Sequence, residues 1–214
     1  MSERRRCVII GGAGISDYEF ARSRIREDDY VIYCDSGLRH MDRLHASPNL
    51  IVGDFDSYEK PETDVETIVL PREKDDTDTV FAVKEALRRG CDRFLLTGVI
   101  GARLDHTLGN VSILLLLDSI GVPAAIIDDY SEMEIVSRYE AAVSGDYAYF
   151  SLLNISGTAS GISISDARYP LENAEITCEY QYGISNEVLP GRTARVSVKS
   201  GRLLLVKVRR ESEH

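Results

Sequence analysis

The chain has 214 residues, of which 43% are hydrophobic and 28% charged, enough for one large domain or two small ones with buried cores. Its formal net charge of −10 repels phosphate backbones and disfavours a general nucleic-acid-binding protein. No apolar run reaches the length of a membrane span, and the start MSERRRCVIIGG does not resemble a secretory signal. The four cysteines form no CxxC pair. We expect a cytoplasmic protein that binds neither nucleic acid nor membrane.

Short β-type runs alternate with helical stretches in the first part of the chain, and turn residues close each run. The six runs are Cys7–Ile10, Tyr30–Cys34, Leu50–Val52, Thr67–Leu70, Arg93–Thr97 and Ala124–Ile127. Helices are predicted over Thr79–Arg89 and Leu104–Ile120, each followed by a glycine stop. The alternation predicts a doubly wound α/β domain with a mostly parallel sheet, which binds ligands at the carboxyl ends of its strands.

The pattern changes after Asp129, where polar and apolar residues alternate between Gly, Asn, Ser and Pro turns. Examples of the alternating runs are Glu175–Tyr180, Ala194–Val198 and Leu203–Val208. This pattern predicts a small antiparallel sandwich or barrel. We therefore predict two domains, at residues 1–130 and 131–214.

The segment Gly53-Asp54-Phe55-Asp56-Ser57 follows a short apolar run. Two carboxylates two residues apart at the end of a strand can converge on one hard cation, which prefers oxygen ligands. Ser57 can donate to a phosphate or cap the following segment. Taken alone, the segment fits an ordinary Asp/Ser turn equally well.

A second acidic segment, Lys74-Asp75-Asp76-Thr77-Asp78, opens a predicted helix, where Asp and Thr are preferred N-caps. One cap does not explain three aspartates and a lysine, because like charges at this density repel unless a cation or substrate offsets them. A magnesium ion shared with the preceding acidic segment would offset them. Asp78 is then the first ligand, Asp75 a second-tier one and Asp76 a solvated bystander, while Lys74 faces a phosphate.

A third segment links a predicted strand to the helix that starts near Leu104, and its helix N-terminus can receive an anion. Its candidate residues are Gly98, Gly101, Arg103, Asp105, His106 and Asn110. Arg103 can fork onto phosphate oxygens. A lone histidine such as His106 is more often a structural hydrogen-bonding residue than a catalyst.

Two glycine-bearing turns add weaker signals. Gly11-Gly12-Ala13-Gly14 fits a phosphate loop and a flexible crossover equally well, and Asp35-Ser36-Gly37 can contact a ribose, orient a metal or form a plain turn. No GxGxxG, GxxxxGK[ST] or GxSxG motif occurs. The acid-rich pattern therefore favours a magnesium–triphosphate site that acts by positioning and electrostatic stabilisation.

In this order the motifs resemble the thiamin pyrophosphokinase family. The family's Asp-Gly-Gly, GDFDS, K/Q-D-x-T-D and G-G-R-L/F-D-H segments are matched at 35–37, 53–57, 74–78 and 101–106. Its Tyr-Pro-Leu and Ser-Asn-Glu segments are matched at 169–171 and 185–187. Ser36 and Ala102 stand where the pattern has glycine. The chain has no tryptophan, so stacking on thiamin falls to tyrosine or phenylalanine, with Tyr169 and Tyr182 as candidates.

The resemblance implies an α/β nucleotide-binding catalytic domain at 1–130, a β-sandwich thiamin-binding domain at 131–214, and a homodimer with active sites between subunits. It implies Mg²⁺-dependent transfer of the diphosphate of ATP to the hydroxyethyl group of thiamin, giving thiamin diphosphate and AMP. The expected ATP contacts are Asp35, Ser57, Lys74, Thr77, Gly98, Gly101, Arg103, His106 and Asn110. The expected metal ligands are Asp54, Asp56, Asp78 and Asp75, and the expected catalytic residues are Asp54, Asp56, Asp78 and Asp105. The expected thiamin contacts are Ser185, Asn186 and Tyr169.

Two other functions fit part of the pattern. A hydroxymethylpterin pyrophosphokinase of similar architecture would use the same metal and triphosphate, although a neutral pterin does not require the acidic pocket that suits the cationic thiazolium. A non-catalytic nucleotide sensor would bind ATP without releasing AMP.

Overall fold

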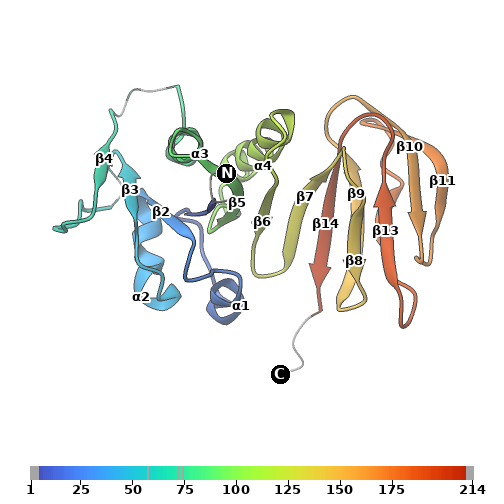
Figure 1. Ribbon diagram of the computed structural model, residues 1–214, viewed down its shortest axis with the longest axis horizontal. Coiled ribbons are helices and arrows are strands. Elements are labelled where there is room, and N and C mark those ends of the chain that lie inside the picture. Colours follow the sequence, from blue (N-terminus) through green and yellow to red (C-terminus); the bar gives the residue numbers. More distant parts are fainter. Residues whose placement is uncertain (1–4, 57, 72, 74, 211–214) are drawn as a thin grey trace. The chain divides into compact units, whose positions relative to one another are not determined.

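The computed structural model describes residues 5–56, 58–71, 73 and 75–210, so the predicted site residues Ser57 and Lys74 lie outside it. The chain divides into two compact units, residues 1–129 and residues 130–214 (Figure 1). None of the described helices is long and apolar enough to cross a membrane.

The first unit is built on parallel strands in the order β6-β5-β1-β2-β3-β4. The strands are β1 (Arg5–Ile10), β2 (Tyr30–Cys34), β3 (Leu50–Gly53), β4 (Thr67–Val69), β5 (Cys91–Thr97) and β6 (Ala124–Ile127). Strands such as β2 are apolar without alternation because helices cover both faces of the sheet. The predicted doubly wound, mostly parallel sheet is confirmed.

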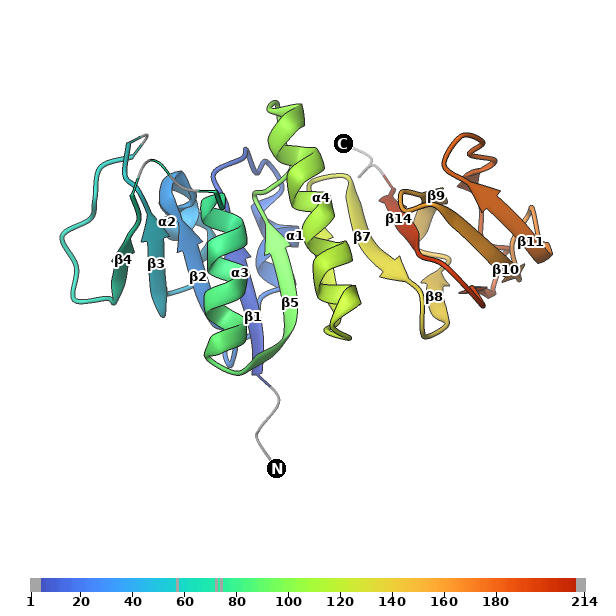
Figure 2. The same cartoon turned by 90° about the horizontal axis from the view of Figure 1, so that it is seen from above.

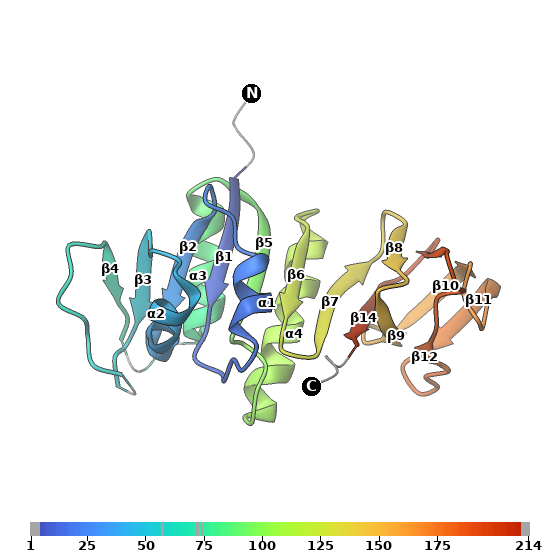
Figure 3. The ribbon, with the colours of Figure 1, turned by 90° about the horizontal axis from the view of Figure 1, so that it is seen from below.

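Four α-helices and one 3₁₀ helix cover this sheet within the described residues. They are α1 (Tyr18–Ser23), η1 (Asp35–His40), α2 (Met41–Leu44), α3 (Asp78–Arg88) and α4 (Leu104–Ser119). Helices α1 and α2 lie on one face, and α3 and α4 lie on the other (Figures 2 and 3). The predicted helices are confirmed as α3 and α4, and Gly90 ends α3 with a positive φ of 83°. The sequence did not predict α1, η1 and α2, because elements of four to six residues are too short to show a helical period.

The strand order reverses beside β1. The chain moves from β1 outward through β2, β3 and β4, then returns to place β5 and β6 on the other side of β1. In an open α/β sheet, ligands bind outside the carboxyl ends of the strands at such a reversal. We therefore expect a ligand site at the segments that follow β1, β2, β3 and β5.

The second unit consists of two antiparallel sheets, ordered β12-β9-β14-β7 and β11-β10-β13-β8. The strands are β7 (Ser131–Val136), β8 (Ala141–Ser144), β9 (Tyr147–Asn154), β10 (Thr158–Ser165), β11 (Leu171–Thr177), β12 (Gly183–Asn186), β13 (Thr193–Ser197) and β14 (Leu203–Arg209). Both sheets supply one buried cluster, including Phe150 and Leu205 from the first and Ile162 and Val196 from the second. This packing is that of a β-sandwich, as predicted.

One strand prediction was wrong in its bounds. The run Glu175–Tyr180 was expected to be a strand, but β11 covers Leu171–Thr177. The chain turns after Thr177, whose carbonyl accepts a hydrogen bond from the Tyr180 N–H at 3.4 Å. The alternation of polar and apolar residues continues beyond the end of β11, so it did not mark the turn.

Candidate active site

A cavity of about 580 Å³ opens at the carboxyl ends of the first unit's strands, within the range typical of ligand pockets. Its lining comes from loops that follow β1, β2, β3 and β5 and from the starts of α3 and α4. The lining residues are Gly11, Gly12, Ala13, Gly14, Cys34, Asp35, Ser36, Asp54, Asp56, Thr77, Asp78, Thr79, Gly98, Val99, Gly101, Ala102, Arg103, His106 and Asn110.

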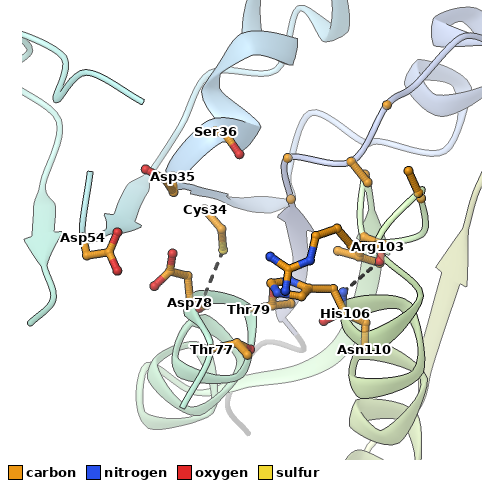
Figure 4. Close-up of a pocket in the computed structure, with 18 of the residues that line it drawn as sticks. Cys34, Asp35, Ser36, Asp54, Thr77, Asp78, Thr79, Arg103, His106 and Asn110 are labelled. Atoms are coloured by element: carbon orange, nitrogen blue, oxygen red, sulfur yellow. Dashed lines mark hydrogen bonds between the residues drawn. The ribbon is translucent and has the colours of Figure 1, made fainter. Parts of the chain in front are cut away.

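Carboxylates occupy one side of this cavity: Asp35, Asp54 and Asp78 point toward one region in Figure 4. Strand β3 can bring Asp54 there because its last residue is glycine. A Cβ at Gly53 would lie only 3.0 Å from the Cα and Cβ of Asp35. Asp35 and Phe55 adopt positive φ values of 39° and 55°, which are uncommon for residues with side chains. Such backbone is typical of functional sites, where the surrounding structure holds it in place.

The electrostatics of Asp35 show how crowded this side is. The side chain is buried, and its Oδ1 accepts no hydrogen bond from any residue in the described ranges. Burial raises the pKa of Asp35, and the negative charges of Asp78, Asp54 and Asp56 raise it further, against a hydrogen bond from the Ser36 backbone that lowers it. Four carboxylates therefore interact in one small region that a cation would stabilise.

The start of α3 supplies one of these carboxylates. Thr77 is the N-cap, and its hydroxyl oxygen accepts a hydrogen bond from the Val80 N–H at 3.3 Å. Asp78 is the first residue of the helix, and its carbonyl lies 3.8 Å from the Cys34 Sγ. Burial raises the pKa of the Cys34 thiol, with Asp78 and Asp35 contributing, so this cysteine stays protonated.

The opposite side of the cavity carries Arg103, His106 and Asn110 (Figure 4). Arg103 is mostly exposed, so its guanidinium is accessible to a ligand in the cavity. Asn110 is buried, and its amide donates to the Val99 carbonyl at 2.8 Å, which holds the loop after β5 against α4. The Thr107 hydroxyl accepts from the Gly101 N–H at 3.1 Å and ties the same loop to the first turn of α4.

Glycines let the loops after β1 and β5 approach closely. A Cβ at Gly11 would lie 2.6 Å from the Gly98 carbonyl oxygen, and a Cβ at Gly98 would lie 2.5 Å from that of Gly11. Gly98 also has a positive φ of 64°. Both loops line the cavity, so the glycine segment at 11–14 is part of the lining of the candidate site.

Among the described residues of the first unit, two predicted site residues, Asp75 and Asp105, lie outside the cavity lining. Asp75 is exposed, and Asp105 is turned to Arg103, whose Nη2 lies 2.6 Å from a carboxylate oxygen. Asp76, which was not expected to bind the metal, accepts hydrogen bonds from the Lys84 ammonium at 2.7 and 2.8 Å.

The residues expected to contact thiamin lie in the second unit. Asn186 is buried, and its side chain is occupied by the backbone of Tyr169, with one bond in each direction at 3.0 and 2.8 Å. Ser185 and Tyr169 are exposed, and Ser185 has a positive φ of 58°. Asn186 is thus a support for Tyr169, whereas Ser185 and Tyr169 are accessible.

Sequence reasoning missed Cys34 and Thr79 as lining residues. Both adjoin residues that it did select, Asp35 and Asp78. The rule that parallel strands end at the ligand would have found Cys34, the last residue of β2.

No group of three or more His, Cys, Asp or Glu side chains forms a ready-made metal site within the ranges that the structure describes. The carboxylates of the cavity surround a region without converging on one point. Any cation held there would need further ligands from water or from substrate.

A cavity with an acidic side and a cationic side, at the carboxyl edge of an α/β sheet, is suited to an enzyme that transfers phosphate groups from a metal-bound polyphosphate. Two family models match the chain: the catalytic domain of thiamin pyrophosphokinase over residues 21–124 and the vitamin B1 binding domain of thiamin pyrophosphokinase over residues 132–203. The chain belongs to the thiamin pyrophosphokinase family, whose enzymes diphosphorylate thiamin with ATP as co-substrate.

Individual relatives agree with this assignment. Thiamine pyrophosphokinase of Bacillus subtilis (strain 168) is 28% identical over 163 residues, which cover 72% of this chain and 76% of that protein. The crystal structure of thiamin pyrophosphokinase from Geobacillus thermodenitrificans has a TM-score of 0.82 and 26% identity, covering 97% of this chain and 99% of that one. The crystal structure of the Bacillus subtilis enzyme, with 23% identity and a TM-score of 0.85 over 97% of this chain and 100% of that one, shows the same fold.

Proposed function

We propose that this chain transfers the diphosphate of ATP to the hydroxyethyl oxygen of thiamin, giving thiamin diphosphate and AMP, with magnesium bound at Asp54, Asp56 and Asp78. The triphosphate binds in the cavity of the first unit. The cationic thiamin is bound by the second unit, through Ser185 and Tyr169.

One observation carries the proposal: the cavity is acidic on one side and cationic on the other. The guanidinium of Arg103 can hold phosphate oxygens through paired hydrogen bonds. The carboxylates opposite it repel a bare triphosphate but attract its metal complex. A polyphosphate with a bound divalent cation therefore matches both sides at once.

Magnesium fits this donor set. It prefers carboxylate oxygens, keeps several waters, and is usually held by one or two carboxylates together with substrate phosphates. A ready-made cluster of three ligands is therefore not required. The buried Oδ1 of Asp35 and the raised pKa of that carboxyl identify the same region as one where positive charge is favourable. When bound, magnesium would neutralise the triphosphate charge that the carboxylates otherwise oppose.

The reaction is an in-line displacement at the β-phosphorus. The thiamin hydroxyl oxygen forms a bond to this phosphorus while the bond to the oxygen bridging the α- and β-phosphates breaks, so AMP leaves with that oxygen. The protein contributes mainly position and charge, because phosphoryl-type transfer requires little covalent chemistry from it. Asp78 is the candidate acceptor of the hydroxyl proton, since it lines the cavity and Asp105 does not.

We further propose that the enzyme is a cytoplasmic homodimer with active sites between subunits. The free state of all four cysteines supports a reducing compartment. Exposed Tyr169, Tyr180, Tyr182 and Ile184 in the second unit give it a surface suited to an aromatic ligand or a second subunit.

A substrate panel tests the proposal. The protein is incubated with ATP and Mg²⁺ together with thiamin, hydroxymethylpterin or no acceptor, and AMP is quantified. AMP release that requires thiamin is expected. AMP release with the pterin instead would replace the substrate, and ATP-dependent stabilisation without AMP release under any condition would support a nucleotide sensor.

A further inference from the structure

Residues 11–16, called the glycine loop below, join β1 to α1 and line the cavity at Gly11 to Gly14. The part of the glycine loop that lines the cavity is hydrogen-bonded to the end of β5 and the residue after it. The Gly11 N–H donates to the Thr97 carbonyl at 2.9 Å, and the Ala13 N–H donates to the Gly98 carbonyl at 2.8 Å. The N–H groups of Gly12 and Gly14 make no hydrogen bond to any other residue in the described part of the chain. Such backbone amides are suited to phosphate oxygens.

His40 does not line the cavity but is hydrogen-bonded to the glycine loop. It is 2% exposed, and its Nε2 lies 2.8 Å from the Ala13 carbonyl oxygen while its Nδ1 lies 2.6 Å from the Tyr18 hydroxyl. A carbonyl can only accept, so Nε2 carries the proton and donates it. In the neutral ring Nδ1 then accepts from the Tyr18 hydroxyl. Burial lowers the pKa of His40, and Arg39 and Arg43 lower it further against the opposing effect of the Ala13 bond, which supports the neutral ring.

Asp129 holds the other end of the same loop. It follows β6, and its carboxylate accepts hydrogen bonds from the Ser16 N–H at 3.0 and 2.9 Å and from the Asp17 N–H at 2.9 Å. Neither His40 nor Asp129 lines the cavity. Both act on the loop's backbone, whose glycines would otherwise sample many conformations.

We propose that His40 and Asp129 are positioning residues for nucleotide binding, which hold the glycine loop in the shape that presents its Gly12 and Gly14 amides to the phosphates. The inference rests on the proposed function, because it requires a phosphorylated nucleotide in the cavity. A loop fixed before binding loses less conformational entropy when the ligand arrives. Removing the hydrogen bonds that either His40 or Asp129 makes to the glycine loop should therefore weaken the binding of a triphosphate and leave the binding of the nucleoside unchanged.

Matched variants at each position separate the hydrogen bond from the shape of the side chain. His40→Gln can place an amide N–H where Nε2 lies, whereas His40→Met is similar in size and has no donor. Asp129→Asn retains one acceptor oxygen, and Asp129→Leu retains none. Dissociation constants for ATP and adenosine are measured by calorimetry, together with KM for thiamin and the melting temperature.

His40→Met and Asp129→Leu are expected to raise Kd for ATP about tenfold, the effect of losing a hydrogen bond that orders the site. Kd for adenosine and KM for thiamin should not change, and the Gln and Asn variants should recover most of the ATP affinity. Unchanged ATP affinity in the Met and Leu variants would overturn the inference. An equal loss of ATP and adenosine affinity would also overturn it, because the residues would then serve the fold only.

A further variant keeps the inference testable if His40→Met fails to fold. If His40→Met does not fold, Tyr18→Phe removes only the hydroxyl that fixes Nδ1, and it should weaken ATP but not adenosine. Wild-type protein that binds adenosine but not ATP would overturn the proposed function itself. ATP binding by the wild type with no change in the variants would overturn only the positioning roles.

Discussion

The guanidinium of Arg103 donates two hydrogen bonds to the carboxylate of Asp105, from Nε at 3.2 Å and from Nη2 at 2.6 Å. Arg103 lines the cavity and Asp105 does not. The side-chain hydrogen bond from Arg103 lowers the pKa of Asp105 to about 2, so this carboxylate is a poor proton acceptor. We therefore predict that Asp105 supports Arg103 and is not the proton acceptor.

The first prediction separates these two roles. Asp105→Asn should lower kcat/KM by less than about tenfold, because the amide oxygen introduced there can still accept a hydrogen bond from Arg103. Arg103→Met should lower it by about a hundredfold or more, since a fork onto phosphate is lost. Steady-state kinetics with ATP varied at saturating thiamin measure both. A loss above about a hundredfold in Asp105→Asn, which general-base removal can produce, would restore Asp105 as the proton acceptor.

The second prediction concerns the proposed cation ligands. Asp54→Asn should reduce kcat by about a hundredfold or more and reduce the rise in melting temperature that Mg²⁺ and ATP together produce. Asp76→Asn is the matched control, because Asp76 belongs to the same acidic region of the sequence but pairs with Lys84 outside the cavity lining. Equal activities in the two variants would remove Asp54 from the cation site.

The third prediction follows from the raised pKa of Asp35. The folded protein holds this proton more tightly than the unfolded chain, whose value is 3.8, so stability falls as pH rises from 3.8 through the higher folded pKa. At pH 7, above the unfolded value, the cost of burying this group as a charge lowers the stability of the folded protein. Asp35→Asn should therefore melt at a higher temperature than wild type at pH 7 without magnesium.

The same comparison below pH 3.8 provides the control for Asp35. The carboxyl is then protonated in both states, so the advantage of Asp35→Asn should shrink. The variant should also lose activity, as expected where a site is kept at a cost in stability. A lower melting temperature for Asp35→Asn at pH 7 would show that the Asp35 charge is already compensated.

The fourth prediction tests Asn186 as a structural residue. Asn186→Ala removes buried hydrogen bonds with the Tyr169 backbone and should lower the free energy of unfolding by about 1–3 kcal/mol. Urea unfolding measures this loss. Ser185→Ala is the neighbouring control, and because Ser185 is exposed it should change stability by less than about 0.5 kcal/mol. Equal stabilities in the two variants would contradict the structural role.

Much of the catalytic unit was predictable because parallel strands end at one edge of their sheet. Asp54, directly after β3, and Gly98, directly after β5, could be assigned to the ligand edge from the sequence, and the structure places both in the cavity lining. The choice between adjacent helical residues could not be made in this way. Asp105 and His106 are neighbours in α4, yet only His106 lines the cavity, since consecutive helical side chains point about 100° apart.

Contacts between distant segments were equally hidden. Nothing in the spacing of Asn186 indicates that its amide is bonded to the backbone of Tyr169, seventeen residues away. Likewise the sequence did not indicate a role for His40 or Asp129. The side chain of each is hydrogen-bonded to backbone groups of residues 11–17, and such bonds leave no sequence motif. Short elements such as η1, which carries His40, have no periodicity to indicate them.

The central claim is transfer of a diphosphate, and the stoichiometry of the products tests it most directly. The purified protein is supplied with ATP, Mg²⁺ and thiamin, and nucleotides and thiamin phosphates are quantified together over the time course. The account predicts AMP and thiamin diphosphate in a ratio of one to one, with no ADP formed. Accumulation of ADP with thiamin monophosphate would contradict it.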